Sequence, residues 1–208
     1  YTATVYEKGA EVIGMLKTLV GDAGYRAALD LYFERHDGEA ATIEDWLAVF
    51  EDATGRDLPQ FKRWYTDAGT PRVKVSESWG AGRYELTLEQ INPKGGAKVI
   101  PVAVGLLNPN GDEVVATRVL ELTETRQSFA FEGLASRPIP SILRGFSAPV
   151  ILERAVPTAE RAFLLAHDTD PFNRWESGRA LAKEVLAQMV VAGAEPSRDL
   201  LDGLAQLA

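Results

Sequence analysis

A tyrosine near the start of the chain, Tyr6, has the residue type and the setting for catalysis by hydrogen-bond donation. Tyr6, Gly9, Ile13 and Val20 lie along nearly the same side of a helix with 3.6 residues per turn. The spacing therefore predicts that Tyr6 faces inward where this helix starts, and that its hydroxyl could point into a cavity beside Gly9. The alternative is a core tyrosine whose hydroxyl is satisfied by a carbonyl group. The apolar residues of the same helix are Val12, Ile13, Leu16, Leu19 and Val20.

Longer stretches in order along most of the chain carry a specific resemblance. They read Val-Tyr-Glu-Lys-Gly-Ala-Glu-Val at 5–12, Leu-Tyr-Phe-Glu-Arg-His-Asp-Gly at 31–38, Trp-Tyr-Thr-Asp-Ala-Gly-Thr-Pro at 64–71, Phe-Ser-Ala-Pro-Val at 146–150 and Asp-Pro-Phe-Asn-Arg-Trp at 170–175. This set closely resembles the aminopeptidase N family of zinc metallopeptidases, a gluzincin family, with the bacterial alanyl aminopeptidases nearest. The resemblance implies a parent protein that removes N-terminal amino acids from peptides.

The resemblance also implies roles for individual residues. The tyrosine of the family's Tyr-Glu-Lys-Gly motif lies opposite the zinc ion and donates a hydrogen bond to the oxyanion of the reaction, and this role falls on Tyr6. A donor aimed at developing negative charge is worth roughly 100- to 1000-fold in rate. Tyr1 matches a position that lines the pocket for the substrate's first side chain. For Glu7 and Lys8 we expect structural roles, since helix N-termini favour carboxylates and a lysine one turn in is usually solvated.

The metal-binding part of such a site is missing from this sequence. Zinc hydrolysis of this kind needs His-Glu-x-x-His on a helix and a third carboxylate ligand. The chain has two histidines, His36 and His167, and neither is followed by the required residues. The family's Gly-Ala-Met-Glu-Asn segment, which holds the substrate's free amine, is also absent. We therefore expect zinc in the parent protein, no metal bound to this chain and no activity of this chain alone.

Composition limits the remaining function classes. With 208 residues, 46% hydrophobic and 25% charged, the chain has an ordinary globular composition. A net charge of −8 with scattered acidic residues argues against nucleic-acid binding, and the longest apolar stretch, 99–107, is far below the roughly 20 residues of a membrane helix. The absence of cysteine fits a reducing compartment, so we expect a cytoplasmic location.

Periodicity divides the chain into three parts of a multidomain α+β protein. Residues 1–69 read as helices, with a break at Gly21 and a capping box formed by Thr42 and Asp45. Residues 70–154 read as an antiparallel β-sandwich. Residues 155–208 read as helices again, with Asp170 as a cap. The expected strands include 99–107, 114–120, 127–131, 141–146 and 150–153.

By the resemblance, these parts are the end of a thermolysin-like catalytic domain, a β-sandwich domain and the start of a C-terminal helical domain. Both ends of the chain look like cuts, so we expect apolar faces exposed by truncation and self-association through them. The segment Gly80-Ala81-Gly82-Arg83 joins two strands and is interpreted as a hairpin turn rather than a phosphate loop.

Two readings other than a peptidase stay open. One is a non-catalytic scaffold that positions partners, within a degenerate relative that has lost its metal site. The other is a carbohydrate-binding sandwich, for which Trp79 beside a Gly-rich turn is the only surface aromatic candidate. The presence or absence of the zinc motif upstream of Tyr1 separates the peptidase from the scaffold.

Overall fold

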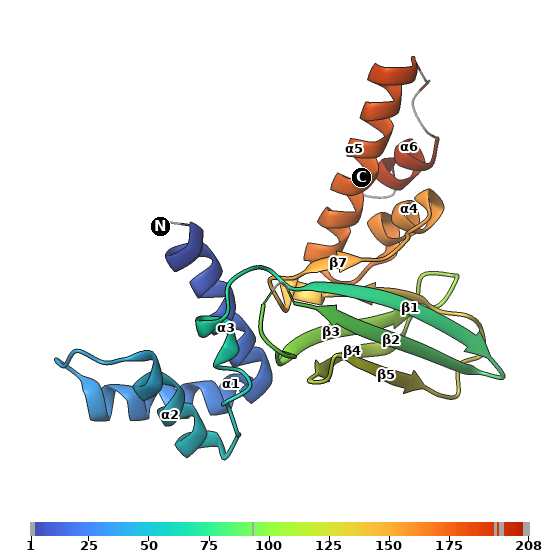
Figure 1. The fold of residues 1–208 in the computed structure, drawn as a ribbon. Coiled ribbons are helices and arrows are strands. Elements are labelled where there is room, and N and C mark those ends of the chain that lie inside the picture. Colours follow the sequence, from blue (N-terminus) through green and yellow to red (C-terminus); the bar gives the residue numbers. More distant parts are fainter. Residues whose placement is uncertain (1–2, 93, 194, 196–197, 206–208) are drawn as a thin grey trace.

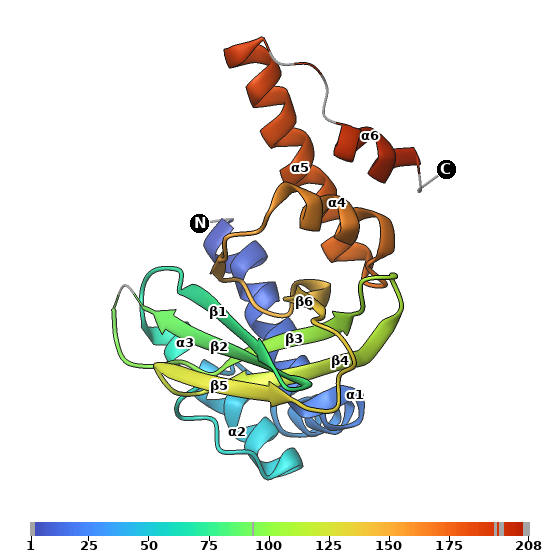
Figure 2. The ribbon, with the colours of Figure 1, turned by 90° about the vertical axis from the view of Figure 1, so that its right-hand side faces the viewer.

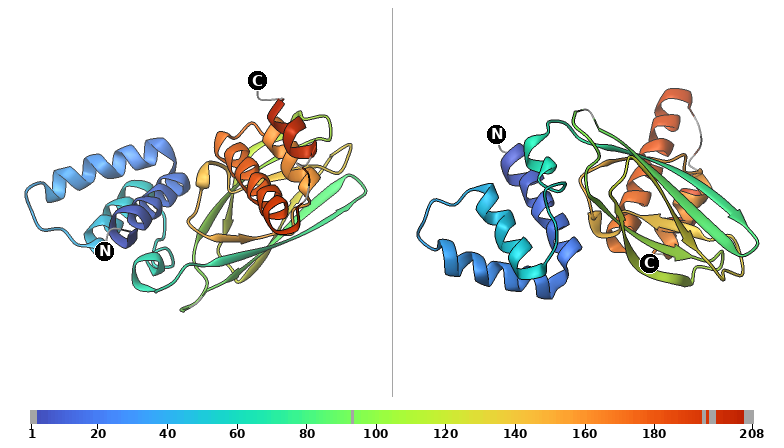
Figure 3. Two further views of the ribbon diagram at one scale, coloured as in Figure 1. Left: turned by 90° about the horizontal axis from the view of Figure 1, so that it is seen from above. Right: turned by 60° about the horizontal axis from the view of Figure 1, so that its bottom comes forward.

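Helices form the N-terminal part of the computed structural model, which describes residues 3–92, 94–193, 195 and 198–205. They are the π-helix η1 (Ala3–Lys8) and the α-helices α1 (Gly9–His36), α2 (Ile43–Thr54) and α3 (Arg63–Thr66). Gly21 has the non-helical angles φ 73° and ψ 169°, and the two halves of α1 point in different directions (Figure 3). The break predicted at Gly21 is therefore confirmed.

Local sequence signals explain how α2 begins and ends. The Thr42 hydroxyl accepts a hydrogen bond from the Asp45 N–H at 3.2 Å, and the Asp45 carboxylate accepts one from the Thr42 N–H at 2.8 Å. This is the predicted capping box. The helix ends at Gly55, whose φ of 69° is the left-handed conformation that suits glycine.

In the part of the chain that the structure describes, seven strands make the two sheets of the sandwich (Figure 1). One sheet has the order β5-β2-β1-β7 and the other β4-β3-β6. The Ala81–Gly82 turn joins β1 to β2 with φ values of 51° and 75°, as a two-residue hairpin turn requires, so the predicted hairpin is confirmed. The strands are β1 (Arg72–Gly80), β2 (Arg83–Ile91), β3 (Ile100–Leu107), β4 (Glu113–Leu122), β5 (Arg126–Phe131), β6 (Ile139–Ile142) and β7 (Ile151–Glu153).

Two details of the sandwich differ from the prediction. The pairing of β7 with β1 is parallel, whereas the other pairs are antiparallel. The expected strand at 141–146 is wrong beyond Ile142, because Leu143 has a φ of 61° and the short 3-10 helix η2 (Arg144–Phe146) follows. This turn directs the Arg144 side chain into the interior, where it is 4% exposed.

Among the described residues, three helices follow the sandwich, and α5 extends away from it (Figure 2). They are α4 (Thr158–His167), α5 (Pro171–Ala192) and α6 (Arg198–Ala205). The predicted cap at Asp170 is confirmed, because its carboxylate accepts a hydrogen bond from the Asn173 N–H at 2.8 Å and Pro171 is the first helical residue. No helix in the described parts of the chain combines enough length and apolar character to span a bilayer.

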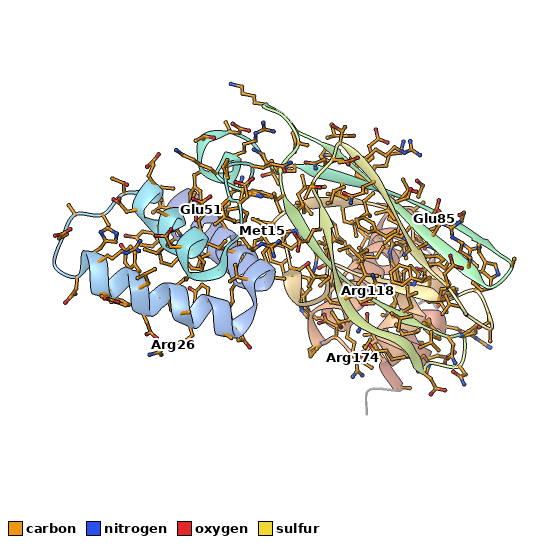
Figure 4. All side chains as sticks on the ribbon, turned by 90° about the horizontal axis from the view of Figure 1, so that it is seen from below. Met15, Arg26, Glu51, Glu85, Arg118 and Arg174 are labelled. Atoms are coloured by element: carbon orange, nitrogen blue, oxygen red, sulfur yellow. The ribbon has the colours of Figure 1, made fainter. Side chains whose placement is uncertain are left out.

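A single hydrophobic core continues from the N-terminal helices into both sheets. It includes Leu16 of α1, Phe50 of α2, Leu86 of β2 and Ile100 of β3, each 0% exposed. Figure 4 shows Met15 between the helices and the sandwich, and Arg26 pointing away from the molecule. A second, smaller cluster lies between the C-terminal helices and contains Leu165, Leu181 and Val185.

Candidate functional site

Tyr6 lies in the π-helical turn η1, immediately before α1 begins. Its side chain is 66% exposed, so the prediction that it faces inward is wrong, and the alternative of a core tyrosine is wrong as well. Ile13, expected on the same inward side, is also exposed, at 37%. Tyr1, the other tyrosine singled out from the sequence, lies outside the described residues.

The buried side of the first half of α1 is rotated from the predicted one. Its buried residues are Val12, Met15, Leu16 and Leu19. A π-helical turn has a different number of residues per turn from an α-helix. The face of α1 predicted from α-helical spacing therefore does not extend into η1. Single-turn π segments occur frequently at functional sites. The structure therefore leaves Tyr6 largely exposed at the end of the helix.

Lys8 has a fixed partner rather than the solvated position expected from the sequence. Its ammonium group donates a hydrogen bond to the carbonyl oxygen of Gly69 at 2.8 Å, across 61 residues of sequence. Burial lowers the pKa of Lys8, and the charge of Lys98 lowers it further. The neighbouring Glu7 is exposed, and the structural role expected for it stays a prediction.

The two histidines lie apart and do not form a metal site. His36 ends α1, where its ring lies 5.5 Å from the Tyr32 ring and its Nδ1 lies 3.9 Å from the Glu39 carboxylate. His167 ends α4, where its ring lies 4.7 Å from that of Phe163. Within the described residues, no group of three or more histidine, cysteine, aspartate or glutamate side chains could hold a metal ion. The residues present therefore do not fit the zinc ion that the resemblance implies.

A buried arginine cluster, which the sequence reasoning missed, joins the sandwich to the C-terminal helices. The Arg144 guanidinium donates to the Ser141 hydroxyl at 2.9 Å, to the Thr117 hydroxyl at 2.9 Å and to the Asp168 carboxylate at 3.2 Å. It also pairs with Glu113 of β4. Arg144 and Asp168 are 4% and 0% exposed, so this ion pair is fully withdrawn from water.

The two carboxylates of this cluster differ in their electrostatics. The hydrogen bond from Arg144 lowers the pKa of Glu113. Burial raises the pKa of Asp168, although hydrogen bonds from Ser141 and Asp170 and the Arg144 charge oppose this effect. The Asp168 Oδ2 atom has no hydrogen-bond partner. Since these groups serve to join two parts of the fold, we interpret the cluster as structural.

A cavity of about 740 Å³ opens beside this cluster, between β6, β7 and the helices α4 and α5. Its lining is mainly apolar and includes Ile142, Phe146, Leu164, Phe172 and Trp175. The arginines at its edge are already paired: Arg154 with Glu77 and Glu160, Arg161 with Glu184, and Arg179 with Glu176. The cavity therefore offers no unpaired charge that would select a ligand.

Comparison with known proteins gives three adjoining family matches. Residues 1–65 match the Peptidase family M1 domain. Residues 69–155 match a domain of unknown function with an Ig-like fold (DUF3458), and residues 158–208 match a domain of unknown function with ARM repeats (DUF3458_C). Helices, sandwich and helices, in this order, thus define a segment of a multidomain protein of the Peptidase M1 class.

Individual relatives agree with this class. The chain is 43% identical over 194 residues to aminopeptidase N of Caulobacter vibrioides and 38% identical over 196 residues to aminopeptidase N of Escherichia coli, covering 22% of each relative. These alignments include 89% and 87% of this chain. A crystal structure of Legionella pneumophila aminopeptidase A in complex with aspartic acid matches 100% of this chain and 24% of that chain, with 30% identity and a TM-score of 0.91.

The chain belongs to the aminopeptidase N family, of which it represents a segment. It spans less than a quarter of the length of the curated relatives named above. The family resemblance carried by the five stretches between residues 5 and 175, and the predicted order of helices, sandwich and helices, are confirmed.

Proposed function

We propose that the whole protein containing this chain is a zinc-dependent aminopeptidase, which removes N-terminal amino acids from peptides. Within it, Tyr6 stabilises the oxyanion that forms when the scissile carbonyl is attacked, and Tyr1 lines the pocket for the substrate's first side chain. The observation that carries the proposal is that Tyr6, 66% exposed as a residue, lies in a π-helical turn. This turn lies in the segment that matches the Peptidase family M1 domain.

The chemistry of a phenol suits this role. A hydroxyl that donates to a carbonyl oxygen gains strength as negative charge develops on that oxygen, so it stabilises the transition state more than the bound substrate.

The proposal assigns this chain one part of the reaction. The described residues offer no set of metal ligands, so zinc, the attacking water and the amine anchor are left to the rest of the whole protein. This chain alone is accordingly expected to be inactive, because a stabilised oxyanion must first be generated.

The test is hydrolysis of an alanyl or leucyl chromogenic amide by the whole protein with zinc. In Tyr6→Phe, kcat is expected to fall by roughly 100- to 1000-fold with KM little changed, because one oxyanion donor is lost. Tyr32→Phe is the matched control: it removes a tyrosine hydroxyl from α1, where the Tyr32 ring packs against Trp46 at 5.2 Å. Unimpaired turnover in Tyr6→Phe would exclude the role of Tyr6, and an inactive wild-type protein would favour the non-catalytic scaffold.

Partners and location follow from the same proposal. Peptides are the proposed substrates, and the acidic net charge of −8 supports the absence of a nucleic-acid partner. The lack of cysteine supports a cytoplasmic location. Apolar side chains on α5 that are more than half exposed, Leu186, Val190 and Val191, support self-association of the isolated chain through this face.

A further inference from the structure

The turn that carries Tyr6 has an unusual anchor. Lys8 ends η1 and is the N-cap residue of α1, yet its side chain makes no capping bond. The side chain instead extends to the Gly69 carbonyl, 2.8 Å from its ammonium group. Because π-helical turns are rare and depend on their surroundings, a cross-link two residues from Tyr6 restrains the direction in which the phenol points.

The acceptor of this bond follows a helix that is itself fastened to the sandwich. The Lys98 ammonium, only 1% exposed, donates to the Arg63 carbonyl and to the Asp67 carboxylate, both at 2.8 Å. The Trp64 indole N–H donates to the Val99 carbonyl at 2.7 Å. These three bonds fix α3 and its C-cap residue Asp67 on the segment that enters β3. Gly69 lies two residues beyond Asp67, so its carbonyl is held in place by the sandwich.

The environment of Lys8 differs from that of an ordinary surface lysine. Burial lowers the pKa of its ammonium group, and the nearby Lys98 adds to this effect. A hydrogen bond with a charged donor is stronger than one between neutral groups. Figure 1 shows η1 and the start of α1 beside α3, consistent with this short connection.

We propose that Lys8 is a positioning residue for Tyr6, an inference that rests on the proposed function. Hydrogen bonds from Lys98, just before β3, hold the C-terminal end of α3. The chain then continues to Gly69, whose carbonyl accepts the hydrogen bond from Lys8 beside the turn that carries the phenol. The sandwich thereby sets the direction of a catalytic group in the neighbouring helical part. Lys8 acts through Tyr6 and does not touch substrate.

Lys8→Met in the whole protein is the test, with the alanyl or leucyl chromogenic amide as substrate. Methionine keeps most of the apolar length of lysine and cannot donate to Gly69. We expect kcat to fall about 5- to 50-fold with KM changed less than about twofold, because the phenol is misdirected while substrate binding is retained. Lys8→Arg, which keeps a cationic donor, is expected to recover part of kcat. Lys17→Met is the matched control, since Lys17 also lies on α1, with its side chain 53% exposed; its ammonium pairs with the exposed Asp22 and lies 6.0 Å from the centre of the Tyr25 ring.

The double variant Tyr6→Phe with Lys8→Met separates positioning from general damage. If Lys8 acts through Tyr6, the double variant has about the same kcat as Tyr6→Phe alone. The role of Lys8 is overturned if the kcat losses of the two single variants multiply in the double variant, or if Lys8→Met keeps its full kcat. Either result would do so even where Tyr6→Phe is impaired. An unimpaired Tyr6→Phe would instead overturn the proposed function. We expect Lys8→Met and wild type to have equal thermal midpoints. A large fall of the midpoint in both Lys8→Met and Lys8→Arg would instead indicate that the lysine is merely structural.

Discussion

Replacing Gly105 of β3 by alanine is expected to break the junction between the sandwich and the C-terminal helices. A Cβ atom on Gly105 would lie 2.1 Å from the Cζ atom of Arg144 and 2.3 Å from its Nη1 atom. Real Cβ contacts are essentially never shorter than 3.0 Å, so the guanidinium must move. The displaced Arg144 would lose its hydrogen bonds to Ser141, Thr117 and Asp168 together.

The magnitude follows from the burial of this cluster. Asp168 is 0% exposed, and removal of its cationic partner leaves a buried charge without compensation. Breaking a buried ion pair in this way costs about 3–5 kcal/mol. For a chain of about 150–250 residues, where each kcal/mol shifts the midpoint by about 2–4 °C, the thermal midpoint should fall by about 6–20 °C.

Circular dichroism melts of the 208-residue chain measure this effect. Gly80→Ala is the matched control, because Gly80 also lies in a strand but has no atom within 4 Å of its added Cβ. In an Arg144→Met background, Gly105→Ala is expected to cost much less, since the group that it displaces is gone. Equal thermal midpoints of Gly105→Ala and Gly80→Ala would refute the role of the Arg144 clash. So would a fall in midpoint caused by Gly105→Ala that is the same with Arg144 as with Met at position 144.

Two further predictions concern stability of the helical part. Gly14→Ala in α1 should stabilise the chain by about 0.5–1 kcal/mol, since alanine suits a helix interior and nothing lies within 4 Å of the added Cβ. Gly24→Ala in the same helix should gain less, because its Cβ would lie 3.1 Å from Thr54 Cγ2; equal gains in urea unfolding would contradict this difference. The hydrogen bond from Lys98 lowers the pKa of Asp67, so its contribution to stability is complete above an ordinary aspartate pKa of about 3.9 and is lost as pH falls through the lowered value. Asp67→Asn should therefore be less stable than wild type at pH 7 and approach it in strong acid, and a constant difference between pH 7 and pH 2 would contradict this origin.

Local signals allowed much of the fold to be predicted. The caps at Thr42 and Asp170 and the break at Gly21 depend on residues within a few positions, so they can be read from a single sequence. The alternation in β2 gives Tyr84, Leu86 and Leu88 as its buried side, because side chains of a strand alternate between two faces. The parallel pairing of the short β7 depends on the whole sandwich and carries no such signal.

The candidate site was less accessible to sequence reasoning. The family motif identifies Tyr6 as a residue of interest, but the π-helical turn changes the direction of its side chain from the one that α-helical spacing implies. The partner of Lys8 is 61 residues away, and those of Arg144 come from β4, β6 and the segment between α4 and α5. Such contacts exist only after the chain has folded.

The continuous core has a consequence for how this chain folds. Residues 1–65 and 69–155 match separate families, yet Leu16, Phe50 and Ile100 lie in one cluster of buried side chains. The boundary between the two family matches therefore does not coincide with a boundary in the packing of the core. Helices α1–α3 and the sandwich are therefore expected to gain or lose their packing together. The small cluster of Leu165, Leu181 and Val185 is separate from this core and is joined to the sandwich through Arg144 and Asn173, so it can open only when these bonds break. Local opening at the C-terminal helices would accordingly leave the Tyr6 turn and its anchor intact.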